Sequence, residues 1–224
     1  YTGWLCTYFI YDDYKNLRCV VQPKGVEVIS ATWTLTDATI LAEQCFRYEY
    51  DNRNRVILQK VPRAGEVRMV YDQWDRVVLT QDANMRTTNK WMFTKYDQLN
   101  RPILTGTYVN ATHTTQSAMQ TYLNTQNMAR SENYNPTGAL PMYTMNLSFP
   151  VITYADVLTA TYYDDYAWTI GVPAYFRQFE SGYNGYFYTA SNSTWPYAQA
   201  LTATVHTRGL STGAITKTTD GVTA

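Results

Sequence analysis

A tyrosine followed directly by an aspartate, with an arginine a few positions later, recurs along this chain. Phenol, carboxylate and guanidinium groups can together take part in acid–base catalysis, so one hypothesis is that the pattern marks a catalytic site. A catalytic set is normally made once in a chain, whereas a packing device recurs. The pattern occurs four times, as Tyr11-Asp12 with Arg18, Tyr50-Asp51 with Arg55, Tyr71-Asp72 with Arg76, and Tyr96-Asp97 with Arg101. Its repetition favours a structural role over catalysis.

Other residues with catalytic potential are few and scattered. His113 and His206 are the two histidines, and neither has a nearby carboxylate in sequence from which a Ser/His/Asp triad could start. Asp164-Asp165 suggests a glycosidase pair, but neighbours on a strand point to opposite faces and cannot readily flank one bond. The cysteines lack zinc-ligand spacing, and no glycine-rich stretch stands between a strand and a helix as a phosphate loop requires. We expect no catalytic site, no metal, no cofactor and hence no enzyme.

The residues that follow each arginine are also similar among the four copies. The second residue after each arginine is Val or Ile, the third is Val or Leu, and the fourth is polar. In the last three copies the arginine lies five residues after the tyrosine, while the first copy carries two extra residues. The tyrosines of these three copies are 21 and 25 residues apart, which is the scale of one supersecondary unit per repeat.

The residues around each copy predict two strands joined by a turn. Upstream of the tyrosine, apolar residues alternate with polar ones, as in Val67, Met69 and Tyr71, which is the period of a strand. The aspartate starts a turn because its side chain accepts hydrogen bonds from backbone N–H groups of that turn. Three residues later, the last three copies have Asn or Asp, which tolerate the left-handed conformation that closes such a turn. Each repeat is therefore predicted to be a β-hairpin.

One hairpin is only marginally stable, but stacked hairpins share an apolar face and satisfy one another's backbone groups. Stacking would place tyrosine over tyrosine, with each arginine near the rings and turn aspartates. We expect an all-β, mainly antiparallel fold of stacked β-hairpin repeats forming a curved or spiral open sheet, with one short amphipathic helix. The expected segments are 1–108 for the hairpins, 109–150 for the helix and an irregular connection, and 151–224 for a further β-rich part with a degenerate repeat and a flexible tail.

The segments after the fourth copy are less regular. Residues 114–131 place apolar side chains at helical spacing after threonine caps, without Pro or Gly, and so predict the amphipathic helix. Tyr163-Asp164 begins a fifth, worn copy in which Trp168 stands where the arginine should fall. Residues 205–224 are rich in Thr, Gly and Ala, which predicts a flexible end or a strand that needs a missing neighbour.

Composition and charge limit the classes of partner. Lys plus Arg and Asp plus Glu number 18 each, so the net charge is zero and no whole-molecule field favours nucleic acid or an anionic membrane. No apolar run approaches the length of a membrane span. Cys6, Cys19 and Cys45 are expected to be buried thiols, with one disulfide pair left open as an alternative. The chain begins with Tyr rather than Met, and we expect an excised piece of a longer protein.

The stretches YDNRNR, YDQWDR and YDQLNR resemble the RHS/YD repeat of large bacterial surface and toxin-delivery proteins, whose usual form is Y-D-x-x-G-R. The opening IYDDYKNLRCVVQP is similar to a longer-turn variant of that repeat. The resemblance covers residues 8–108 and, more weakly, 154–168. In this chain Asn or Asp replaces the usual turn Gly, and four good copies are present.

That resemblance implies hairpins wound into a spiral sheet, often as a hollow shell around a C-terminal toxin or other cargo. It implies a non-catalytic structural module, a slice of such a shell or scaffold in a larger secreted or cell-surface bacterial protein. The implied partners are the rest of the larger RHS-repeat polypeptide or its cargo domain.

A second function class is left open by an aromatic segment near the end of the chain. Exposed rings at Tyr183, Tyr186 and Trp195 would stack on sugar faces, with Asn and Ser binding hydroxyls, in a carbohydrate-binding module with a glycan partner. The period-two spacing of Tyr186 and Tyr188 equally suits rings that face a core.

The edges of the predicted sheet pose a separate question. An open stack of hairpins leaves unpaired edge strands, which invite pairing with another chain. We therefore expect either self-association through an edge strand or coverage of that edge by the helix at 114–131.

Overall fold

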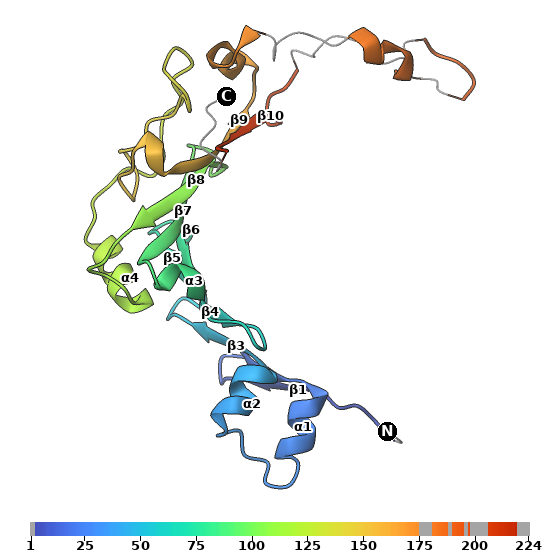
Figure 1. The fold of residues 1–224 in the computed structure, drawn as a ribbon, viewed down its shortest axis with the longest axis vertical. Helices are drawn as coiled ribbons and strands as arrows, with labels where there is room; N and C mark the ends of the chain where they lie inside the picture. Colours follow the sequence, from blue (N-terminus) through green and yellow to red (C-terminus); the bar gives the residue numbers. More distant parts are fainter. Residues whose placement is uncertain (1–2, 175–180, 188–189, 195–196, 198–205, 219–224) are drawn as a thin grey trace. The chain divides into compact units, whose positions relative to one another are not determined.

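The computed structural model describes residues 3–174, 181–187, 190–194, 197 and 206–218. Ten strands follow one another in chain order in one open sheet, and every strand pair with a defined register is antiparallel (Figure 1). The expected all-β, mainly antiparallel open sheet is confirmed. The strands are β1 (Tyr8–Tyr11), β2 (Leu17–Val21), β3 (Cys45–Tyr50), β4 (Val56–Lys60), β5 (Val67–Tyr71), β6 (Val77–Gln81), β7 (Lys90–Tyr96), β8 (Pro102–Val109), β9 (Val157–Tyr163) and β10 (Ser211–Thr216).

Four short α-helices lie in the connections between strands. They are α1 (Pro23–Ile29), α2 (Ala38–Glu43), α3 (Ala83–Arg86) and α4 (Gln116–Asn124). In the described part of the chain, 3-10 helices follow at Tyr154–Asp156, Ala167–Gly171 and Ser181–Tyr186. The predicted helix is α4, which is shorter than the 114–131 span and is capped by the Thr115 hydroxyl. Helices α1, α2 and α3 were not predicted, because helices of four to seven residues are too short to show a helical pattern of apolar residues.

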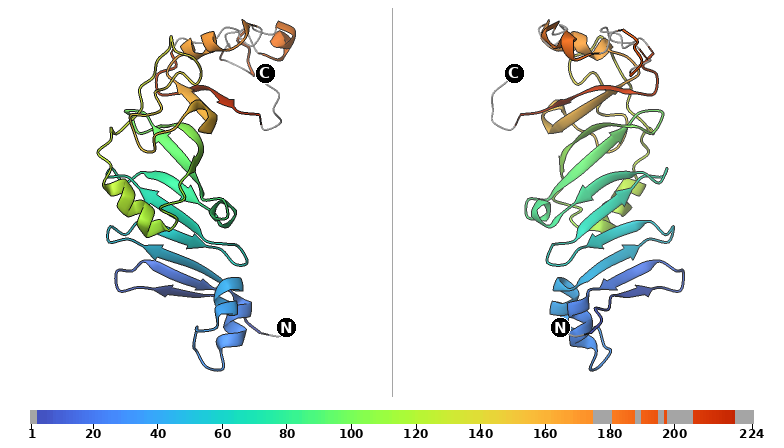
Figure 2. Two further views of the ribbon diagram at one scale, coloured as in Figure 1. Left: turned by 60° about the vertical axis from the view of Figure 1, so that its left-hand side comes forward. Right: turned by 90° about the vertical axis from the view of Figure 1, so that its right-hand side faces the viewer.

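The chain forms two compact units, Tyr1–Thr94 with Gly106–Ala129, and Lys95–Thr105 with Arg130–Ala224. In the first unit, the hairpins β1–β2, β3–β4 and β5–β6 lie side by side (Figure 2). Each has a register shift next to its tyrosine, which then faces the first residue of the return strand. These pairs are Tyr11 with Leu17, Tyr50 with Val56, and Tyr71 with Val77.

The core of the first unit runs along the stacked strands. Val21 on β2 and Cys45 on β3 are a cross-strand pair, and both are fully buried. The α1 and α2 connection covers this pair with Val26 and Ile29. Further along, the buried side chains are Val70, Leu79, Trp91 and Phe93. Burial of this apolar area is the main stabilising contribution, at about 25 cal/mol per Å².

Helix α4 packs against β5, where its buried residues are Met119 and Leu123. The Gln120 side-chain amide both accepts from the Tyr71 backbone N–H (2.9 Å) and donates to the Tyr71 carbonyl (2.7 Å). Gln116 donates to the Met69 carbonyl in the same way. The helix thus binds backbone groups of an interior strand, so the expectation that it covers an outer edge of the sheet is wrong.

In the second unit, β9 and β10 form a hairpin, with Tyr163 facing Ser211 across the strands. β10 is therefore a paired strand rather than part of a flexible tail. Tyr143, Tyr162 and Trp168 stack in this unit, with ring centroids 5.6 and 4.8 Å apart. Gly213 lies directly against the indole of Trp168, so no larger residue fits there. The indole of Trp168 therefore covers β10 at Gly213.

Candidate functional site

The recurring Tyr-Asp motifs form tight corners at which the chain reverses between two strands. In the second hairpin, the Asp51 backbone N–H donates to the Arg55 carbonyl (3.0 Å), which closes the turn. Asp51 Oδ1 accepts from the backbone N–H groups of Arg53 and Arg55, both at 2.9 Å. Its Oδ2 accepts from Arg55 Nε at 2.7 Å. We number the corner positions 1 to 6, from Tyr50 to Arg55.

The third and fourth corners repeat this geometry. Asp72 accepts from Trp74 N–H, Arg76 N–H and Arg76 Nε at 2.8–3.0 Å. Asp97 in the second unit accepts from the equivalent groups of Leu99 and Arg101 at 2.6–2.9 Å. Aspartate suits position 2 because one carboxylate satisfies three donors of a single turn.

Position 5 of each corner has a left-handed backbone. The φ angles are +59° at Asn54, +63° at Asp75 and +63° at Asn100. These are the three Asx residues that the sequence pattern placed in this conformation, where β-carbons are otherwise disfavoured. The first corner has Lys15 at this position, with φ +66°.

The first corner differs from its sequence alignment. Asp12 N–H donates to the Asn16 carbonyl, and Asp12 Oδ1 accepts from Asn16 N–H, so Asn16 occupies position 6. The first turn therefore has the same length as the other turns, and it contains no two-residue insertion. Arg18 lies on β2 instead, where it forms a 3.4 Å ion pair with Glu49 and is 38% exposed.

Neighbouring hairpins of the first unit are joined by their tyrosines. The Tyr50 hydroxyl donates to the Leu17 carbonyl at 2.9 Å, and the Tyr71 hydroxyl donates to the Val56 carbonyl at 2.7 Å. Each acceptor is the first strand residue after position 6 of the preceding hairpin. A tyrosine is therefore required rather than phenylalanine, because its ring packs while its hydroxyl satisfies a carbonyl of the neighbour.

Position 6 joins the same neighbours through charge. The Arg55 guanidinium lies over the Tyr71 ring, 4.5 Å from its centroid, and Arg55 Nη1 binds Asp75 Oδ1 at 2.7 Å. One arginine thus contacts position 2 of its own corner and positions 1 and 5 of the next. At the first step, Asn16 Nδ2 donates to Asn54 Oδ1 (3.0 Å) in the equivalent contact.

In the second unit, Arg101 contacts the fifth hairpin in a related way, but the carboxylate that it binds there is at position 2 rather than position 5. The Tyr163 hydroxyl donates to the Pro102 carbonyl at 2.9 Å, and the Arg101 guanidinium lies 4.3 Å from the Tyr163 ring centroid. Arg101 Nη1 and Nη2 bind both carboxylate oxygens of Asp164 at 3.0 and 2.8 Å. Tyr163 and Asp164 thus form a corner that binds the preceding hairpin, and Asp164 makes a bidentate ion pair with Arg101.

The fifth corner is assembled from two distant segments. Asp164 N–H donates to the Leu210 carbonyl (3.0 Å), and Gly209 N–H donates to Asp164 Oδ1 (2.6 Å). Leu210 therefore takes position 6 and Gly209, with φ +85°, takes position 5. Trp168, which the sequence placed at the arginine position, stacks on Tyr162 instead. The only sequence signal was a glycine in a turn 45 residues away, which pattern spacing could not connect.

These contacts lower the pKa values of the corner carboxylates Asp51 and Asp164. Burial raises the pKa of Asp51, but the hydrogen bonds from Arg55 and Arg53 outweigh burial and lower it below its usual value. The hydrogen bonds from Arg101 and from Gly209 N–H lower the pKa of Asp164 to about 2. The same ion pair raises the pKa of Arg101. Asp51 and Asp164 are therefore charged at neutral pH, each bound to an arginine, which suits packing more than proton transfer.

Lys95 and Glu132 form a buried ion pair in the second unit, which was not predicted from the sequence. Lys95 Nζ binds Glu132 Oε1 at 2.6 Å and the Ser148 carbonyl at 2.7 Å, and both charged side chains are fully buried. Glu132 also accepts from the Ser148 hydroxyl and from Thr144. Burial raises the pKa of Glu132, but Lys95 and these hydrogen bonds outweigh burial and hold the pKa below its usual value. Full burial makes this a structural cross-link.

The aromatic residues of the carbohydrate hypothesis are only partly described. Tyr186 is 80% exposed, and Tyr197 is 85% exposed. The side chain of Tyr183, and Trp195 as a whole, lie outside the described residues. The three rings are therefore not brought together on one described surface.

Other potentially reactive residues lie in the described part of the chain. There, no group of three His, Cys, Asp or Glu residues has metal-binding geometry. His113 stacks on Tyr122 at 4.2 Å, which is a packing contact. Cys19 and Cys45 are buried free thiols, whereas Cys6 is a free thiol on the surface, so the expectation of burial is wrong for Cys6. None of the helices in the described ranges is long and apolar enough to cross a bilayer.

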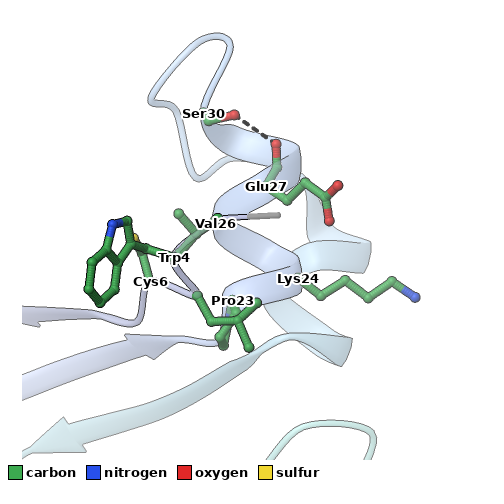
Figure 3. Close-up of a pocket in the computed structure, with 9 residues that line it drawn as sticks. Trp4, Cys6, Pro23, Lys24, Val26, Glu27 and Ser30 are labelled. Atoms are coloured by element: carbon green, nitrogen blue, oxygen red, sulfur yellow. Dashed lines mark hydrogen bonds between the residues drawn. The ribbon is translucent and has the colours of Figure 1, made fainter. Parts of the chain in front are cut away.

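A cavity of about 490 Å³ lies between the N-terminal segment and α1 of the first unit. Trp4 and Cys6 line one side, and Pro23 and Val26 line the other (Figure 3). The Lys24 side chain extends away from Trp4 in this view, so the lining is mainly apolar (Figure 3). A ligand site usually adds convergent polar groups to an apolar lining, and this cavity does not show them.

No protein-family model matches this chain, and no curated protein matches it. Similar solved structures come from Tc toxins. One is a crystal structure of TcdB2-TccC3, with 15% identity and a TM-score of 0.35 over 70% of this chain and 7% of that chain. Another is the Photorhabdus luminescens Tc holotoxin pore, with 17% identity and a TM-score of 0.34 over 69% of this chain and 7% of that chain. The chain thus spans a small fraction of these toxin chains, and a likeness of this size assigns neither fold nor function.

Proposed function

We propose that this chain is a non-catalytic segment of a repeat wall, of the RHS/YD class, within a larger secreted or cell-surface bacterial protein. The wall scaffolds or encloses another part of that protein, such as a toxin domain. One observation carries the proposal, namely that each corner is built to bind the next hairpin. Arg55 contacts both Asp75 and the Tyr71 ring, and the Tyr71 hydroxyl returns to the Val56 carbonyl.

Repetition of one contact supports a wall rather than a site. The tyrosine-to-carbonyl bond recurs for Tyr50, Tyr71 and Tyr163, at 2.7–2.9 Å in each case. An interface that uses the same donor and acceptor at every step extends by adding further copies, as in other repeat proteins. The corner charges are also saturated by one another, since the Arg55 and Asp51 side chains are 18% and 17% exposed. They are poorly placed to act on a substrate.

The motif supports the finer assignment to the RHS/YD class. The corners read Tyr-Asp-x-x-Asx-Arg in the second, third and fourth hairpins. Asn or Asp at position 5 meets the same backbone requirement as the usual glycine, because Asx residues are the best non-glycine residues in the left-handed region.

Limited proteolysis of the larger protein that contains this segment tests the proposal. With the wall intact, the enclosed part should resist protease. The double variant Asp72→Ala/Arg76→Ala removes one corner, and we expect it to make the enclosed part sensitive. Arg18→Ala, which alters an exposed ion pair outside the corners, serves as the matched control. Equal protease sensitivity of the intact protein and the corner variant would contradict the wall function.

A further inference from the structure

No described strand pairs with the outer edge of β1, whereas the second and third hairpins each have a preceding neighbour. All four residues of β1 are exposed, by 41–57%, whereas the equivalent tyrosine on β5, Tyr71, is 8% exposed. Among the described residues, the Tyr11 hydroxyl has no hydrogen-bond acceptor, unlike Tyr50 and Tyr71. β1 therefore presents one half of the interface that joins the other hairpins.

The interior steps show what the missing half contributes. At both steps in the first unit, position 6 of one hairpin donates to position 5 of the next. Asn16 Nδ2 donates to Asn54 Oδ1, and Arg55 Nη1 donates to Asp75 Oδ1. Position 5 is the acceptor side of this contact, and position 6 is the donor side.

In the first corner, position 5 holds a hydrogen-bond donor instead of an acceptor. Its position 5 is Lys15, a cation, and the side chain is exposed with no hydrogen bond or ion pair to the described residues. Lysine is also a poor choice for the left-handed backbone at this position, where φ is +66°. A neighbour with arginine at position 6 would place two positive charges together, and like charges at facing positions are destabilising.

We propose that the outer edge of β1 binds a β-hairpin of the same Tyr-Asp class that has Asp or Glu, in place of arginine, at corner position 6. This inference rests on the proposed wall function and names the partner at one edge. The Tyr11 hydroxyl donates to the first carbonyl of the partner's return strand. The Lys15 ammonium binds the partner's carboxylate, and the partner strand covers Phe9 and Ile10 on the two faces of β1.

The register of the chain allows a direct test. Tyr11 is equivalent to Tyr71, so residues 1–6 are equivalent to the connection 61–66, which joins the second and third hairpins. A copy of residues 45–60 fused directly before Tyr1 of the full chain therefore has a linker of natural length. Two versions are made, one with the native arginine at position 6 and one with Arg55→Glu in the added copy alone.

Both fusions are combined with native Lys15 and with Lys15→Asp, which places an Asx residue at position 5 as in the other corners. The measurement is backbone hydrogen exchange of β1, Tyr8–Tyr11, against the unfused chain. Because Arg55→Glu also removes the ion pair with Asp51 inside the added copy, each copy is compared across the two residues at position 15. Lys15→Asp should lower the protection given by the glutamate copy, relative to that given by the arginine copy, about fivefold, since opposite and like charges differ by roughly this factor. With Lys15→Asp, the arginine copy should protect better.

The outcomes separate this inference from the wall function on which it rests. If the ratio of protection between the glutamate and arginine copies is the same with Lys15 as with Lys15→Asp, the carboxylate partner is overturned but hairpin stacking stands. If no copy slows exchange with either residue at position 15, then β1 does not accept a hairpin, and both the inference and the proposed wall fail at this edge.

Discussion

The Arg55 guanidinium lies over the ring of Tyr71 in the next hairpin, with its central carbon 4.5 Å from the ring centroid. The same guanidinium binds Asp51 in its own corner at 2.6 Å and Asp75 in the next at 2.7 Å. A single side chain thus ties together two consecutive hairpins, and it is only 18% exposed. Such a residue holds the repeat in register, because each of its partners belongs to a fixed position of a corner.

Arg55→Ala should therefore be strongly destabilising. We expect a loss of about 2–3 kcal/mol in the free energy of unfolding, because the partly buried Asp51 carboxylate and the more exposed Asp75 carboxylate lose a charged hydrogen-bond donor. Arg18→Ala removes an arginine that makes one 3.4 Å ion pair while 38% exposed, and it should cost about 0.5 kcal/mol or less. Chemical denaturation of both variants measures the difference, and similar losses would refute the role of the corner.

Tyr71→Phe tests the bond between hairpins without disturbing ring packing. The hydroxyl donates to the Val56 carbonyl at 2.7 Å, so its removal leaves that carbonyl without this donor, at a cost of about 1–2 kcal/mol. Tyr11→Phe removes the equivalent hydroxyl at the exposed edge and should change stability by less than about 0.5 kcal/mol. Thermal unfolding gives both values. A loss from Tyr11→Phe as large as from Tyr71→Phe would show that the bond between hairpins is not what the phenol supplies.

Asp164 should contribute to the acid sensitivity of the second unit. The hydrogen bonds from Arg101 and Gly209 lower its pKa from 3.8 to about 2, so the folded state binds fewer protons than the unfolded state between these values. The stabilisation is fully present above pH 3.8 and is lost as pH falls through about 2. Because the side chain is 37% exposed, salt should weaken the effect.

The measurement is the melting temperature between pH 5 and about pH 2, where Asp164→Asn should flatten the decline relative to the unmodified chain. Asp13→Asn, which changes an exposed carboxylate of the first corner, is the control. The assignment fails if Asp13→Asn flattens the profile as much as Asp164→Asn does.

The three thiols should react at very different rates in the folded chain. Burial, together with the neighbouring Cys19 thiol, raises the pKa of Cys45 to about 12, and burial raises the pKa of Cys19. Cys6 is exposed. Iodoacetamide at about pH 8 should modify Cys6 alone within minutes and the other two only after unfolding, as followed by intact mass. Uniform labelling of all three thiols in the native protein would contradict the buried β2–β3 core.

Local features followed directly from the sequence. The turn at Asp51 uses a carboxylate that accepts from its own backbone, and the left-handed position after it favours Asn, Asp or Gly, so spacing alone located Asn54, Asp75 and Asn100. Strand alternation located β5 and β6 for the same reason, since side-chain direction in a strand is set by neighbouring residues. These interactions span a few residues, and a single sequence contains them entirely.

The first corner shows where spacing misleads. Arg18 stood in the expected column, yet Asn16 closes the turn, because the hydrogen-bond register of β1 and β2 pairs Tyr11 with Leu17. Register is decided by which strand residues face each other across the whole hairpin. The only sign of this register in the sequence was that Arg18 lies two residues further from its tyrosine than the other arginines do.

The sequence by itself determined that the chain is a series of Tyr-Asp hairpins, because each turn is specified by residues within one corner. Only the tertiary structure decided which residues complete the fifth corner, where Asp164 meets Gly209 and Leu210, and which charges are buried, as for Lys95 and Glu132. Those contacts join segments far apart in the chain. Their partners are chosen by the packing of the folded unit, which no local pattern encodes.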